Sequence, residues 1–178
     1  MLSNNKVLLT YFLYLALGFI FFLTFHINEF PNKYTFTDWL INYEGGFVRR
    51  GLLGQIVFEL SKLLNLQFKY VMLFFQITFY SIYFLLFFSL LSKMKINFFW
   101  LLIIFSPISF LYPIAELETL GRKDIFVITF FLIFSIINYK SLNILLFSFI
   151  LLFGLSSLIH EITIFYIFHY LFVFYVKN

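Results

Sequence analysis

The residues of this sequence that could do chemistry are few, and the most informative of them surround a pair of glycines. Gly45 and Gly46 permit backbone conformations with positive φ, and Arg49 and Arg50 follow directly before an apolar run of helical spacing. Guanidinium groups are always charged and can bind phosphate through two parallel hydrogen bonds, and the first amides of a helix add further donors. The segment therefore predicts a cradle for a phosphate or diphosphate. The alternative is a plain turn whose arginines reach lipid headgroups.

A second charged segment lies between two apolar runs at residues 116–124. It holds three acids and two bases, namely Glu116, Glu118, Arg122, Lys123 and Asp124. Glu118 and Arg122 are four residues apart and would pair on a helix. Arg122 and Lys123 could extend the phosphate site, while a carboxylate such as Glu118 or Asp124 binds sugar hydroxyls or accepts a proton. A solvated loop whose charges cancel is the alternative.

A third pair, His160 and Glu161, lies deep in apolar sequence. Ionisable groups inside a membrane segment cost at least about 2.5 kcal/mol each, so they are candidate functional residues. His160 titrates near neutrality when unperturbed and is a candidate general base; the alternative is a structural pair that joins two helices. Asp38 is a further candidate because it is expected on the same side as the arginines. With Trp39 it indicates a short interfacial helix with an aromatic anchor.

The composition places these residues in a membrane protein. Of 178 residues, 63% are hydrophobic and only 11% are charged, and 31 are Phe, which excludes a water-soluble enzyme. At about 20 apolar residues per helix the length allows roughly five or six spans. The chain has no Cys, and its three His have no zinc-like spacing, so we expect neither metal nor cofactor. No basic block indicates nucleic acid as a partner.

The apolar pattern predicts an all-α, polytopic transmembrane helix bundle that forms one membrane domain over residues 1–178. Spans are expected at Val7–Phe25, Tyr70–Leu91, Asn97–Tyr112 and Ile125–Ile137, with two short spans inside Leu142–Val176. This last stretch would be roughly 50 Å long as one helix, so it must fold back near residues 154–161. Residues 51–65 carry a polar stripe and predict a short interfacial or re-entrant helix.

The charges segregate by side if residues 51–65 do not cross the membrane. With Lys6 in the cytoplasm, four further lysines also face the cytoplasm: Lys93, Lys95, Lys140 and Lys177. All eight carboxylates and all three arginines then fall on the opposite side, in agreement with the positive-inside rule. We therefore expect a multi-pass protein of the bacterial inner membrane whose extracytoplasmic face holds the functional groups.

The segments 43–52, 120–124 and 160–161 resemble polytopic proteins of bacterial surface-polysaccharide clusters. Those proteins are O-antigen or capsule polymerases, or related membrane glycosyltransferases of the C-type fold. The polymerases typically have about ten or more spans, so the resemblance to a chain of this length implies a truncated or partial version.

The resemblance implies transfer of sugars from a polyprenyl-diphosphate-linked glycan at the extracytoplasmic face, with other membrane proteins of polysaccharide assembly as partners. Arg49, Arg50 and Arg122 would stabilise the departing diphosphate. His160, Glu161 or Glu44 would deprotonate the acceptor hydroxyl. The alternative from another class is a transporter or channel component, in which an intramembrane His160 and Glu161 bind an ion or relay protons.

Overall fold

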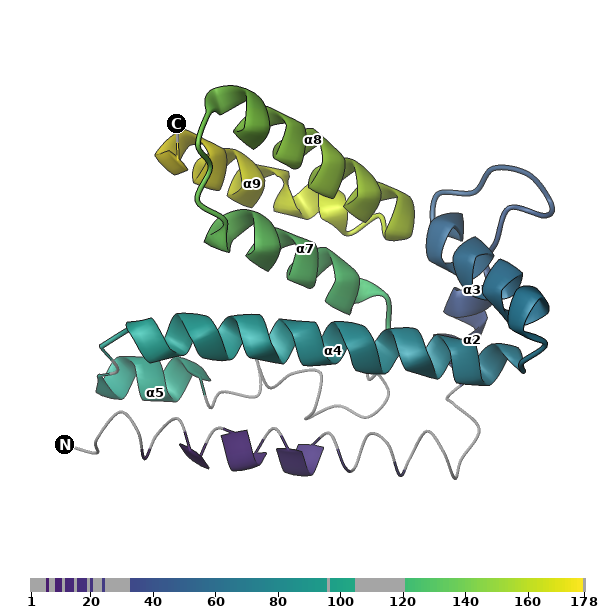
Figure 1. The fold of residues 1–178 in the computed structure, drawn as a ribbon, viewed down its shortest axis with the longest axis horizontal. Coiled ribbons are helices and arrows are strands. Elements are labelled where there is room, and N and C mark those ends of the chain that lie inside the picture. The colour runs from purple at the N-terminus through teal and green to yellow at the C-terminus, as the bar shows by residue number, and fades with distance from the viewer. Residues whose placement is uncertain are drawn as a thin grey trace. The chain divides into compact units, whose positions relative to one another are not determined.

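The computed structural model describes residues 33–95, 97–104 and 121–177, together with single residues and short runs of 6–24. Within these residues every regular element is a helix, which confirms the all-α prediction (Figure 1). The helices are α2 (Lys33–Leu40), α3 (Gly51–Leu64), α4 (Phe68–Lys93), α5 (Phe98–Ile104), α7 (Asp124–Ile136), α8 (Leu142–Ile159) and α9 (Thr163–Lys177).

The chain folds into two compact units. The first comprises Met1–Phe36 and Phe84–Arg122, and the second comprises Thr37–Tyr83 and Lys123–Asn178. In the first unit, Asn97 starts α5 by accepting a hydrogen bond from the amide of Trp100 at 3.0 Å. The predicted span Asn97–Tyr112 begins as expected, but residues 105–120 lie outside the described part of the chain, as do most residues of the predicted first span.

The second unit is built around α7, α8 and α9, which run alternately up and down and pack side by side (Figure 1). The predicted break in the long apolar stretch is confirmed, because α8 ends at Ile159 and α9 begins at Thr163. At its other end α8 begins with a cap, since the amide of Ile144 donates to the hydroxyl of Ser141 at 3.4 Å. The start of α7, the end of α8 and the start of α9 therefore lie at the same end of the bundle.

Aromatic side chains fill the interior of this bundle. Phe134 of α7 and Tyr170 of α9 are fully buried, with ring centroids 5.3 Å apart, and Leu145 of α8 completes the cluster. Such ring pairs contribute about 0.5–1.5 kcal/mol beyond the burial of their area. The abundance of Phe in the sequence thus supplies the contacts that hold α7, α8 and α9 together.

The start of α7 is also the point where α2 and α4 join the bundle. The ring of Phe126 lies 3.9 Å from that of Phe79 in α4 and 5.7 Å from that of Trp39 in α2, measured between centroids. Trp39 is 0% exposed. The expectation that Trp39 anchors the helix at the membrane surface is therefore wrong, because its indole ring packs against Phe126 in the interior of the protein.

The helix predicted at residues 51–65 is confirmed as α3, which ends where Asn65 adopts a left-handed conformation with φ of 52°. Its first turn packs closely on the segment that follows α2. A Cβ on Gly54 would lie only 2.6 Å from the carbonyl oxygen of Trp39 and would also collide with that of Ile41. A glycine at this position is therefore required by close packing, and it fixes the start of α3 beside the end of α2.

By length and composition, α4 and α8 could each cross a membrane, whereas α7 and α9 are shorter apolar helices of 13 and 15 residues. Large apolar side chains cover the exposed outer faces of α8 and α9, among them Phe147, Phe165 and Phe168. An apolar outer surface is suited to lipid rather than water. These features support membrane association, and the total of five or six spans stays a prediction.

Candidate functional site

Three segments that are far apart in the sequence meet around Arg50, which directly precedes α3. Its Nη2 donates a hydrogen bond to Oε1 of Glu161, in the turn between α8 and α9. Its Nη1 lies 3.8 Å from Oδ1 of Asp38 in α2. The guanidinium is thus held between two carboxylates at the end of the bundle where α7 starts. The structure thus brings together three of the candidate residues, Arg50, Asp38 and Glu161.

Lys123 forms the floor of this cluster. It is 0% exposed, and its Nζ donates hydrogen bonds to the backbone carbonyls of Asp38 at 2.7 Å and of Arg50 at 2.9 Å. Burial lowers the pKa of Lys123 to about 8; the charge of Asp38 opposes this shift and that of Arg50 adds to it. The amino group therefore joins the end of α2 and the start of α3 to the start of α7 from inside the protein.

Beside Lys123, the next residue along the chain faces a buried histidine. Oδ1 of Asp124 lies 3.3 Å from Nε2 of His160, whose side chain is only 6% exposed. The other ring nitrogen, Nδ1, accepts a hydrogen bond from the backbone amide of Ile162 at 3.1 Å. Because Nδ1 is an acceptor, the neutral ring carries its hydrogen on Nε2, facing the carboxylate.

This arrangement changes the role that the sequence suggests for His160. Both ring nitrogens already face protein groups, so the geometry favours orienting the turn between α8 and α9 over proton abstraction from a substrate. His160 and Glu161 also lie in that turn, at the end of two helices, rather than inside a membrane-spanning helix. The energetic penalty for an ionisable pair in the middle of a span therefore does not apply to them.

The two carboxylates beside Arg50 differ in their surroundings. The hydrogen bond and charge of Arg50 lower the pKa of Glu161, with smaller contributions from the charges of His160 and Arg49, so this exposed carboxylate is ionised at neutral pH. The side chain of Asp38 is only 10% exposed, and neither of its oxygens accepts a hydrogen bond from the residues that the structure describes. Glu161 can therefore accept a hydrogen bond from a ligand at the surface, whereas both oxygens of Asp38 are buried beneath it.

The remaining predicted site residues lie in other places. Arg49 is exposed on the loop beside the cluster, and its charge reaches Glu161. Glu44 forms a separate ion pair with Lys62 of α3 at 3.1 Å. Arg122 belongs to the first compact unit, and Glu118 lies outside the described residues.

One contact that supports the loop beside the site was not anticipated from the sequence. Gln55 was assigned only to a polar stripe, yet its side-chain oxygen accepts a hydrogen bond from the amide of Tyr43 at 2.9 Å, which ties the loop to α3. Gly46 makes the turn of this loop with a φ of +116°. Positive φ at one of the two glycines was expected, whereas nothing in the sequence indicated the partner of Gln55.

The cluster can bind and orient a ligand through charge and hydrogen bonds. Arg49 offers an exposed cation and Glu161 an exposed acceptor for hydroxyl groups, while the buried carboxylate of Asp38 lies beside Arg50. In the part of the chain that the structure describes, no group of three His, Asp or Glu side chains is placed to hold a metal ion. No family model, curated protein or solved structure matches the chain.

Proposed function

We propose that the protein works in bacterial surface-polysaccharide biosynthesis as a multi-pass protein of the inner membrane. In this proposal it binds a polyprenyl-diphosphate-linked glycan at the extracytoplasmic face and acts there as a polymerase or glycosyltransferase. One observation carries the proposal. Asp38, Arg50 and Glu161, which come from three distant segments, meet at one end of the bundle of α7, α8 and α9.

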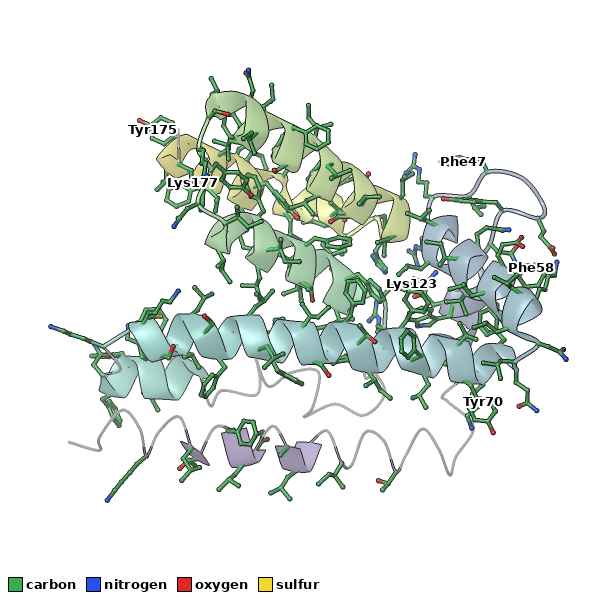
Figure 2. All side chains as sticks on the ribbon, viewed as in Figure 1. Phe47, Phe58, Tyr70, Lys123, Tyr175 and Lys177 are labelled. Atoms are coloured by element: carbon green, nitrogen blue, oxygen red, sulfur yellow. The ribbon has the colours of Figure 1, made fainter. Side chains whose placement is uncertain are left out.

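The position of the cluster suits a ligand at the membrane surface. Lys123 lies at the cluster end of the bundle, whereas Lys177 lies at the opposite end, where it donates to the carbonyl of Ile137 at 2.6 Å (Figure 2). Lys140 also follows α7 at that opposite end. Lys140 and Lys177 at one end and the carboxylates of the cluster at the other agree with a cytoplasmic lysine end. In this proposal the cluster lies at headgroup level, where the diphosphate of a lipid-linked sugar would also lie.

The charges of the side chains suggest which part of the ligand each of them would bind. Arg49 is exposed and would bind the diphosphate, with Arg50 beside it. Glu161 is exposed and would accept a hydrogen bond from a sugar hydroxyl and take the proton of the attacking hydroxyl, while the buried Asp38 would hold Arg50 from the other side. Lys123 is buried beneath this surface and would not touch the ligand. Its hydrogen bonds to the carbonyls of Asp38 and Arg50 hold these two residues in position.

The proposal is tested with Arg49→Ala and Arg50→Ala, measured by binding of a polyprenyl-diphosphate-linked sugar to the purified protein in lipid nanodiscs. Loss of a charged hydrogen bond worth about 1.5–3 kcal/mol weakens binding by roughly 10–100-fold. In cells, the same variants should shorten the surface polysaccharide on a gel. Lys140→Ala is the matched control, because it removes one exposed positive charge from the other end of the bundle.

Arg49→Ala is the more informative of the two variants, since Arg50 also holds two carboxylates and its loss disturbs the fold. Binding and polymer length equal to those of Lys140→Ala would contradict the proposal. The alternative of an ion or proton site at His160 and Glu161 receives less support, because these residues lie at a helix junction and contact Asp124 and Arg50.

A further inference from the structure

The loop tip, residues 43–49, presents an aromatic side chain away from the protein. Phe47 is 75% exposed and Val48 is 43% exposed. A tight turn produces this shape, because the amide of Gly46 donates to the carbonyl of Tyr43 at 3.0 Å. The rings of Tyr43 and Phe47 stack with centroids 5.6 Å apart and planes 12° apart, so the phenyl ring is held in one direction (Figure 2).

Chain connectivity and one ion pair tie the loop tip to the end of α8. Phe47 is three residues from Arg50, so it lies within about 11 Å of it. Arg50 in turn binds Glu161, two residues beyond the end of α8. Because α8 has 18 residues, it is about 27 Å long, close to the hydrocarbon thickness of about 30 Å. With α8 across the bilayer, a loop tied to its end through Arg50 and Glu161 would be within reach of the headgroup region.

The charges of the loop tip fit the same environment. Arg49 is exposed directly after Phe47 and Val48, so a guanidinium accompanies the apolar side chains. The only acid of the tip, Glu44, is paired with Lys62 at 3.1 Å. Aromatic rings and arginines together favour the membrane interface, where the ring reaches the upper acyl chains and the cation reaches lipid phosphates.

We infer that the loop tip is a lipid-contact surface: Phe47 inserts among the headgroups and upper acyl chains of the bilayer, and Arg49 lies at the level of the lipid phosphates. The partner is bilayer lipid. This inference rests on the membrane placement of the proposed function, but Phe47, the residue that it inserts, has no part in binding the glycan there. Insertion would hold the start of α3, and with it Arg50, at a constant depth.

The test uses site-specific labelling, which the chain permits because it has no native cysteine. An environment-sensitive fluorophore is attached to Phe47→Cys in the full-length protein in vesicles of phosphatidylethanolamine and phosphatidylglycerol. Quencher groups are placed on the lipids either near the headgroup or deep in the acyl chain. Glu59→Cys, on the polar face of α3, is the water-exposed control, and Phe168→Cys, on the exposed face of α9, is the membrane control.

We expect the shallow quencher to remove about half of the emission at Phe47→Cys and little at Glu59→Cys, and the deep quencher to act most strongly at Phe168→Cys. A label at Val48→Cys repeats the measurement should the first variant fold poorly. Quenching at Phe47→Cys and Val48→Cys no greater than at Glu59→Cys, with Phe168→Cys quenched, overturns the inference alone. Absence of quenching at Phe168→Cys as well overturns the membrane placement and the inference together.

Discussion

Raising the pH from about 7.5 to about 9.5 should stabilise the folded protein, and Lys123 should be the cause. In the folded state its pKa is lowered to about 8, first by burial, whereas the ordinary value is 10.5. Between these two values the unfolded chain binds a proton at this position and the folded chain does not. Stability rises with pH wherever the unfolded state binds more protons, so the sign of the effect is positive.

The magnitude follows from the same two values. The difference between 10.5 and about 8, at about 1.4 kcal/mol per pH unit, amounts to about 3 kcal/mol over the whole window. About 2 kcal/mol of this gain falls between about pH 7.5 and 9.5. The upper limit of the window is chosen because tyrosines begin to ionise near pH 10 and would then change the stability of either state.

The assay is unfolding of the detergent-solubilised protein by sodium dodecyl sulfate, followed by circular dichroism at each pH. Lys123→Met should remove most of the rise with pH, because it replaces the titrating group by an apolar side chain of similar length; burial also lowers the pKa of Lys177, which keeps its own contribution. Lys62→Met should keep the rise, because Lys62 is an exposed lysine of α3. The slope with pH is the decisive quantity, since Lys123→Met also removes hydrogen bonds to two backbone carbonyls and so changes the stability at every pH.

The reasoning would be refuted by a wild-type protein whose stability does not change over this window. It would equally be refuted by a Lys123→Met variant that shows the wild-type rise. Either result would mean that the amino group keeps its proton as readily in the folded protein as in water, and that Lys123 is not enclosed by the ends of α2, α3 and α7.

Three further outcomes are expected. Gly54→Ala should destabilise the protein by about 1–3 kcal/mol through overpacking, whereas Gly154→Ala, with open space around its Cβ, should be neutral or stabilising; urea or detergent unfolding distinguishes them. Glu161→Gln should make the protein lose less stability as the pH falls below about 4.5. The ionised carboxylate of Glu161, whose pKa Arg50 lowers, stabilises the folded state, and protonation removes this contribution. Nitrogen NMR should find the neutral ring of His160 protonated at Nε2, and His160→Ala should cost about 1–3 kcal/mol more than His160→Asn, which keeps an acceptor for the amide of Ile162.

The helices themselves were predictable from the sequence because their signals are local. Apolar periodicity and polar interruptions located α3, α4 and α7 to within a few residues, and the length of the final apolar stretch required the break between α8 and α9. The segments with candidate functional residues were also found, because charges are scarce in an apolar chain and therefore conspicuous. Their meeting around Arg50 was only implied by the expected sidedness of the charges.

The burial of individual polar side chains was not predictable, because it depends on partners that are distant in the sequence. A lysine within a charged segment is normally expected at the surface, yet Lys123 is buried. The two carbonyls that accept its hydrogen bonds lie 85 and 73 residues earlier in the chain. Trp39 was expected at a membrane surface because nothing local shows that Phe126 packs against it. In both cases the sequence identifies the residue, but contacts with distant parts of the chain determine whether its side chain is buried or exposed.

These contacts divide the charged residues into two layers with separable effects. Lys123 and the His160 ring are enclosed and are held by backbone groups, so their substitution should lower stability and ligand binding together. Arg49 and Glu161 are exposed above them, so their substitution should weaken binding while the fold persists. Arg50 belongs to both layers, because its guanidinium joins the carboxylates while its carbonyl accepts from the buried amino group. A ligand that takes the place of Glu161 on Arg50 must replace a charge-assisted hydrogen bond, so a group with two negative charges, such as the diphosphate of the proposed ligand, would compete better than a singly charged one.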